Sequence, residues 1–310
     1  MKNSIPISAI PLSDHQKLEL LVKKAGFNRT EISRLTETTY RTVVRWMDEG
    51  IKPHPSASRR IDELFKNHID LSFLVEKLKK KLRDPIRILK DKKALRERFF
   101  LEITYHSNAI EGSRMTFRET ERAIMGQKIR GKEPFEIFEA VNHKNALLEL
   151  MSQIRYGFRM TEAYVLKLHS IVMYNFNDKL PGRYRTGFVN LTNTEKALPS
   201  AQEVPVRMKQ FLKHANRYGA QPISKIARDH YEFESIHPFF DGNGRVGRLI
   251  MITQLLSRGY PPAMIRIEDQ HDYYFALGRG DMGDFKNLIQ MVCDSVIRGY
   301  LFLKKETYGK

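Results

Sequence analysis

The stretch IHPFFDGNGRVGRL, from Ile236 to Leu249, places one histidine, one aspartate and two arginines around three glycines. Two of the glycines flank an asparagine, so the backbone amides there can turn inward and form a nest for an anion. A helix predicted to begin near Arg245 would add its N-terminus behind that nest. Arg245 and Arg248 lie one turn apart on this helix, so both can reach phosphate oxygens. The stretch therefore predicts a phosphate-binding turn between two helices.

Two further side chains in this stretch suit chemistry on a bound phosphate. Asp241 is a hard carboxylate suited to Mg²⁺, and the imidazole of His237 can take a proton from an attacking hydroxyl near neutral pH. A Walker P-loop is excluded because the sequence has no G-x-x-x-x-G-K-[ST]. Ile252 stands where a calcium loop needs its last glutamate, and His230 with His237 lacks the spacing of a zinc site.

The letters HPFFDGNGRVGR match the H-x-F-x-[DE]-G-N-G-R-x-x-R signature of Fic-domain proteins in full. The preceding ARDHYEFES is also similar to the family's lead-in helix, and the resemblance extends over about residues 100 to 300. It implies a mainly α fold, a helical bundle with a β-hairpin flap. It also implies transfer of AMP from ATP to a Ser, Thr or Tyr hydroxyl of a target protein, with release of pyrophosphate.

Carried onto this chain, the resemblance makes His237 the general base and Asp241 the ligand of a Mg²⁺ that bridges the α- and β-phosphates. Phe239 is expected to anchor the loop in the core. Relatives with a bulkier residue at the position of Gly244 phosphorylate their targets instead. The residues expected to hold the ATP phosphates are Gly242, Asn243, Gly244, Arg245 and Arg248.

The segment PGRYRTGFVNLTNTEKALPS resembles the family's G-x-Y-R segment, which leads into the flap. The resemblance implies a hairpin over residues 183–200, under which a target would dock with its hydroxyl near His237. The letters DYYFAL around Tyr273 and Tyr274 look like the family's segment near adenine, but an expected asparagine is absent. The sequence thus does not decide which base the nucleotide carries, and another donor such as UTP remains an alternative.

The sequence SNAIEGSRMT has the order S-x-x-x-E-G of the family's inhibitory motif. Ser107 and Glu111 are one helical turn apart, and Gly112 can end that helix. The resemblance implies an inhibitory helix over about residues 101–112, whose Glu111 pairs bidentately with Arg248 and misaligns ATP. In some relatives this glutamate positions a water that removes AMP, so the reverse reaction is a second alternative.

The first seventy residues predict three short helices, in DHQKLELLVKKAG, TEISRLT and ETTYRTVVRWMDEG. They resemble helix-turn-helix domains of the phage-repressor type over about residues 14–69. In the third helix, one face would pack through Val43, Trp46 and Met47. The residues that would face DNA are Thr39, Tyr40, Arg41 and Arg45. A module that contacts protein is the alternative.

Whole-chain properties set the remaining expectations. Lys and Arg exceed Asp and Glu by 17 in 310 residues, and by about 10 in the first hundred, which favours a polyanionic partner there. We predict a helix-turn-helix-like domain over 1–69, connecting helices over 70–100 and the Fic domain over 101–310. Cys293, the single cysteine, is expected in the core. Without an apolar leader or spanning segment, the sequence predicts a cytoplasmic protein without membrane contact, and the resemblance implies a homodimer. A transcription regulator with a nucleotide-sensing Fic domain is the alternative from another class.

Overall fold

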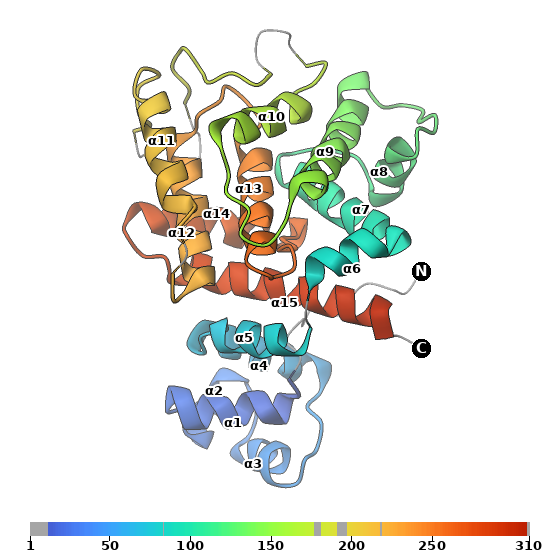
Figure 1. The fold of residues 1–310 in the computed structure, drawn as a ribbon. Helices are drawn as coiled ribbons and strands as arrows, with labels where there is room; N and C mark the ends of the chain where they lie inside the picture. The colour runs from blue at the N-terminus through green and yellow to red at the C-terminus, as the bar shows by residue number, and fades with distance from the viewer. Residues whose placement is uncertain (1–11, 83, 177–180, 191–196, 218, 309–310) are drawn as a thin grey trace. The chain divides into compact units, whose positions relative to one another are not determined.

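The computed structural model describes residues 12–82, 84–176, 181–190, 197–217 and 219–308 (Figure 1). Within these ranges the chain is helical and contains no β-strand. It divides into two compact units, Met1–Leu78 and Lys79–Lys310, each of which is treated separately. The mainly α prediction is confirmed.

The amino-terminal unit is a small helical domain with the three predicted helices at its start. Val43 and Trp46 of the third helix are buried and Met47 is half-buried, as the sequence predicts. The first helix is capped by Ser13, which forms a capping box with Gln16. The helices are α1 (Asp14–Ala25), α2 (Arg29–Leu35), α3 (Tyr40–Asp48), α4 (Pro55–His68) and α5 (Ser72–Lys81), in which the division falls.

The carboxy-terminal unit is built around one helix, α13 (Asn243–Ser257). Every residue of α13 except Gly244 is buried, as expected of a helix covered on all sides. It packs against α7, α9, α10 and α12 (Figure 1). The other elements are α6 (Pro85–Asp91), α7 (Lys93–Ile110), α8 (Phe117–Ile124), α9 (Pro134–Gln153), α10 (Glu162–Val172), α11 (Val204–Ala215), α12 (Pro222–Ile236), η1 (Ile267–Asp269), α14 (Gln270–Asp281) and α15 (Lys286–Tyr308). Cys293 is buried in α15, in agreement with the sequence prediction.

The predicted β-hairpin over 183–200 needs a correction for the part that the structure describes. Residues 183–190 and 197–200 have no strand conformation, and residues 191–196 lie outside the described residues. Side-chain hydrogen bonds take the place of a strand ladder here, since the guanidinium of Arg185 donates to the carbonyls of Gly187 and Pro199. We keep the name flap for residues 183–200.

No helix among the described residues has both the length and the apolar character required to cross a bilayer.

Candidate active site

The signature begins where α12 ends, at a residue with a left-handed backbone. His237 has φ 47° and ψ 61°, and its amide donates to the carbonyl of Phe233 at 3.1 Å, which closes the helix. The chain then turns as far as Gly242, which has φ 76° and is the N-cap of α13. Both ends of the loop thus depend on positive φ values, which glycine adopts freely and which histidine adopts more often than most residues do.

Asn243 and Phe239 hold the loop in this shape. The buried Asn243 side chain accepts from the amide of Phe239 and donates to its carbonyl, both at 2.9 Å. Phe239 is fully buried and stacks on His169 with ring centroids 3.7 Å apart, so its predicted anchoring role is confirmed. The Asn243 side chain therefore serves the loop backbone, and its expected phosphate contact stays a prediction.

His169 connects this loop with the start of the flap. Its Nδ1 accepts from the amide of Gly182 at 2.9 Å, so its Nε2 carries the proton and donates to the carbonyl of Asp241 at 3.1 Å. Burial lowers the pKa of His169 to about 4, which keeps the ring neutral and both contacts intact.

Arg245 is buried at the N-terminus of α13 and has two carboxylate partners. Its Nη1 lies 2.9 Å from Glu139 Oε1 on α9, and its Nη2 lies 3.2 Å from Asp241 Oδ1. Burial raises the pKa of Glu139, and the charge of Arg245 opposes that rise. The ion pair orients the guanidinium beside the turn that carries the nest.

Asp241 is the one ligand that the sequence proposes for a metal ion. Its side chain is 58% exposed, and its Oδ1 accepts from the amide of Gly242. Nowhere in the described ranges do three His, Cys, Asp or Glu side chains come together as a metal cluster. A single accessible carboxylate beside a phosphate nest fits Mg²⁺, which is usually held by one or two carboxylates, substrate phosphates and water.

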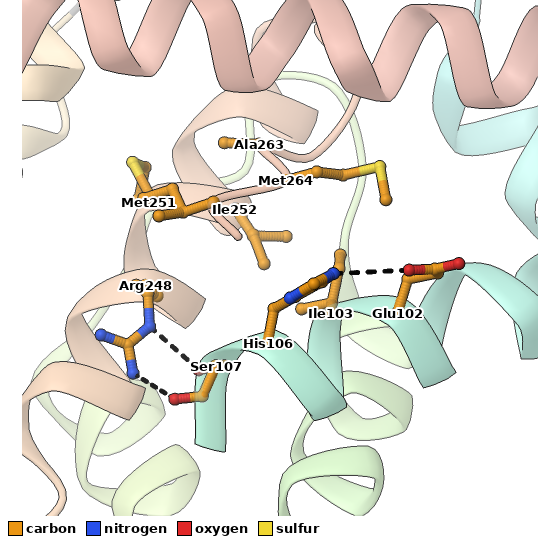
Figure 2. Close-up of a pocket in the computed structure, with 10 residues that line it drawn as sticks. Glu102, Ile103, His106, Ser107, Arg248, Met251, Ile252, Ala263 and Met264 are labelled. Carbon is orange, nitrogen blue, oxygen red and sulfur yellow. Dashed lines mark hydrogen bonds and ion pairs between the residues drawn. The ribbon is translucent and has the colours of Figure 1, made fainter. Parts of the chain in front are cut away.

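Arg248 is 4% exposed and is held by the helix that carries the predicted inhibitory motif (Figure 2). Its Nε donates to Ser107 Oγ at 2.9 Å, and its Nη2 donates to the carbonyl of Ser107 at 2.8 Å. Nη2 also lies 2.8 Å from Glu111 Oε1. The expected pair with Glu111 is therefore present, but it uses one guanidinium nitrogen instead of two, while Ser107 occupies Nε and shares Nη2.

The side chain of Glu111 also lies against Gly244 of the predicted phosphate-binding turn. A β-carbon at Gly244 would overlap Glu111 Oε1 and would lie 3.2 Å from Arg248 Nη1. No described group hydrogen bonds to this Nη1, although the atom is buried. The carboxylate of Glu111 and an unsatisfied donor of Arg248 thus meet at the glycine where the resemblance places phosphate oxygens.

The end of α7 is fixed by its cap and by two side chains of α14. Gly112 has φ 94°, and the amides of Gly112 and Ser113 donate back to Ala109 and Asn108, which forms a Schellman motif. The predicted helix end at Gly112 is confirmed. The carbonyl of Ile110 accepts from Gln270 Nε2 at 2.6 Å and from the hydroxyl of Tyr274 at 3.2 Å.

A buried polar cluster lies beside Arg248. Tyr273, expected near adenine, is fully buried, and its hydroxyl is 2.7 Å from His230 Nε2. Burial lowers the pKa of His230 to about 3, and burial together with the charge of Glu111 raises the pKa of Glu234 to about 8. His230 is therefore a neutral partner of Tyr273, and this placement argues against the zinc alternative.

The profile of the Fic/DOC family matches residues 159–255, which include the complete signature. The carboxy-terminal unit contains a Fic domain. A protein adenylyltransferase Fic from Nematostella vectensis is 32% identical over 244 residues, which are 76% of this chain and 54% of the relative. Protein adenylyltransferase fic-1 of Caenorhabditis briggsae is 28% identical over 70% of this chain and 44% of the relative. The chain thus spans about half the length of the curated relatives it matches.

Solved structures show the same fold. Fic-1 of C. elegans, residues 134–508, superposes with a TM-score of 0.66 at 21% identity, over 96% of this chain and 90% of that chain. A Fic family protein from Desulfovibrio desulfuricans superposes with a TM-score of 0.62 at 25% identity, over 77% of this chain and 76% of that one.

The Fic signature identified the loop but missed the residues that hold it from other elements. Glu139, His169 and Arg185 all contact the loop or its arginine. Glu139 lies in FEIFEAVN, which reads as an ordinary helix face, and His169 lies in an apolar helix. Only the G-x-Y-R resemblance pointed toward Arg185, without indicating its partners.

The surroundings of His237 predict where activity falls at acid pH. Burial is the largest effect and lowers the pKa of His237 below its usual 6.5; the charge of Arg185 acts in the same direction, and Glu111 and Asp241 oppose it. A general base works in its neutral form, which is lost as pH falls through the pKa. We expect the acid limb of the rate to have its midpoint below the usual histidine pKa of about 6.5, measured as initial rates of labelled-nucleotide transfer across the acid range. A midpoint above that value would contradict this assignment.

Proposed function

We propose that the Fic domain transfers AMP from ATP to a Ser, Thr or Tyr hydroxyl of a target protein. The observation that carries the proposal is the single loop that brings together a neutral histidine, an accessible carboxylate and a glycine turn at a helix N-terminus with two buried arginines. Relatives named protein adenylyltransferase support the same reaction.

In the proposed reaction His237 accepts the proton of the target hydroxyl. The hydroxyl oxygen then forms a bond to the α-phosphorus of ATP, and the bond from that phosphorus to the bridging oxygen of pyrophosphate breaks. A Mg²⁺ at Asp241, when bound, would neutralise charge on the α- and β-phosphates. The amides around Gly242 and Gly244 would stabilise the charge that develops on the phosphate oxygens.

Arg245 and Arg248 have different tasks in this proposal. Glu139 fixes Arg245 beside the nest, so that this guanidinium is oriented before ATP arrives. Arg248 is engaged by Glu111, and its free Nη1 faces Gly244. We propose that ATP binds productively only when its γ-phosphate contacts Arg248. Glu111 blocks this contact while it lies over Gly244, so the resting enzyme is self-inhibited.

The position of the label in ATP tests the reaction type. The Glu111→Gly protein, incubated with Mg²⁺ and cell lysate, should transfer label to protein from [α-³²P]ATP and none from [γ-³²P]ATP. Label from the γ-position would indicate phosphorylation instead. Loss of label from a premodified acceptor incubated with the parent protein, which keeps Glu111, together with no gain from either donor, would favour removal of AMP. [α-³²P]UTP in place of ATP tests the base.

A second candidate function concerns the amino-terminal unit, which we propose binds DNA. The observation that favours it is α3, whose side chains Tyr40, Arg41 and Arg45 are exposed, with Thr39 as its N-cap. A turn of four residues separates α3 from α2, as in helix-turn-helix domains.

Replacing Arg41 and Arg45 together by Gln should weaken binding of the full chain to random duplex DNA. Each phosphate contact adds about one unit to the slope of log K against log salt, so the double variant should lose about two units. Fluorescence anisotropy at several salt concentrations measures this slope. The matched control is Lys209→Gln with Lys213→Gln, two exposed cations one turn apart on α11. Affinity that is unmeasurable, or equal slopes for both variants, would remove the DNA proposal.

A further inference from the structure

Arg185 is 2% exposed, yet every partner that the structure gives its guanidinium is a backbone carbonyl. Nε donates to the carbonyl of His237 at 2.9 Å, Nη1 donates to Gly187 at 3.0 Å and Nη2 donates to Pro199. Its own amide donates to the carbonyl of Pro238 at 2.9 Å. Burial lowers the pKa of Arg185, with no carboxylate acting against it. A buried guanidinium is costly unless it is hydrogen bonded, and here each of its three nitrogens donates to a main-chain carbonyl of the described residues.

These contacts join two parts of the site. The carbonyls of His237 and Pro238 belong to the turn that carries the proposed base, where His237 has its left-handed backbone. The carbonyls of Gly187 and Pro199 lie on either side of the flap residues 188–198. One side chain therefore spans both sides of the flap and the catalytic turn.

The shape of the contact requires arginine. The planar guanidinium points its donors in fixed directions, so it can reach three carbonyls at once. A lysine at this position would carry the same charge on one nitrogen and could not reproduce the spread of the three carbonyls. A left-handed non-glycine residue is a strained conformation that persists only where its surroundings hold it. The contact to the His237 carbonyl supplies part of that support.

We infer that Arg185 is a positioning residue that locks the flap to the catalytic turn, so that a docked target hydroxyl and the imidazole of His237 keep one geometry. Arg185 itself touches no reacting atom. The functional part of this inference rests on the proposed AMP transfer, whereas the mechanical link between flap and turn does not. The groups expected to bind ATP are held by other residues, since Glu139 contacts Arg245, and Ser107 and Glu111 contact Arg248. Replacing Arg185 should therefore slow the transfer to the target and leave the affinity for ATP unchanged.

The test uses the full chain in the Glu111→Gly background, with Arg185→Lys compared with Arg207→Lys. Arg207 is the control, an exposed arginine on α11 that lies outside the flap and the signature loop. For Arg185→Lys we expect roughly a tenfold or larger loss in the initial rate per unit of acceptor, since small misplacements of reacting groups can cost up to about 100-fold. The rate is measured over a series of lysate protein concentrations with [α-³²P]ATP. The dissociation constant for ATP, measured by calorimetry, should stay within about twofold, and Arg207→Lys should change neither quantity.

Hydrogen exchange followed by mass spectrometry tests the link without any activity. In Arg185→Lys, peptides from 183–190 and from 237–241 should lose protection together, while peptides from α7 and α13 keep it. Equal behaviour of the Arg185→Lys and Arg207→Lys proteins in both experiments would overturn the inference, and so would a loss of ATP affinity as large as the loss in rate. If no protein transfers label, the proposed function fails, and the exchange data alone decide whether Arg185 joins flap and turn.

Discussion

Replacing His237 by Ala should lower AMP transfer by at least about 100-fold, since a positioned general base contributes roughly 10²–10⁴ to a rate. The loss follows from the chemistry of the target, because a Ser or Thr hydroxyl is a weak nucleophile until a base takes its proton. The His237 imidazole is only partly exposed, and burial keeps the ring in the neutral form that can accept a proton. Transfer from [α-³²P]ATP in the Glu111→Gly background, with and without His237→Ala, measures the effect.

Two controls separate the base from other causes of lost activity. His271→Ala removes an imidazole whose side chain is 95% exposed and should leave the rate unchanged. ATP affinity of the His237→Ala protein should stay within a few fold, because the nest, Arg245 and Arg248 are intact. If the His237→Ala protein keeps more than a tenth of the activity, another group is the base.

Replacing Glu111 by Gly should raise AMP transfer by roughly 10- to 100-fold. The change removes an ion pair to a buried arginine, and charge-assisted contacts of this kind contribute about 1.5–3 kcal/mol, equivalent to that factor. It also clears the carboxylate from Gly244 and removes a negative charge from the place where we expect the triphosphate. Initial rates with [α-³²P]ATP and lysate, parent against variant, measure the gain.

Variants on the same helix separate charge from shape. Glu111→Gln keeps the size of the side chain and loses its charge, so it should give an intermediate gain, and Glu97→Gln on the exposed part of α7 should give none. Gly244→Ala offers a second way to displace Glu111, since its β-carbon takes the space of Oε1. It should alter the rate of the parent and of the Glu111→Gly protein by different factors. If the Glu111→Gly protein has unchanged activity while the His237→Ala protein is inactive in the same assay, Glu111 does not inhibit the enzyme.

The sequence predictions were correct for structural features that depend on residues close together in the chain. The signature loop, the helix end at Gly112 and the packing face of α3 all follow from local rules of backbone geometry and helical spacing. The position of Glu111 against Arg248 came from resemblance, since the two residues lie far apart in the chain. Its bidentate form was wrong, since Glu111 pairs with one guanidinium nitrogen while Ser107 takes Nε and shares Nη2, contacts that form only once the helices pack.

The sequence by itself determined a mainly α chain, a glycine-rich turn between two helices with His237 and Asp241, and a helix end that carries Glu111. Each of these features resides in a few consecutive residues, whose φ values, spacing and side-chain chemistry need no distant partner. Tertiary structure alone decided that Glu139 orients Arg245, that His169 and Arg185 tie the flap to the loop, and that Asn243 serves the backbone. Most of these contacts bridge residues that lie far apart in the chain, and they form because the buried faces of α7, α9, α10 and α13 pack together. A pattern along the chain records which faces are apolar, but only packing determines which polar groups meet between them.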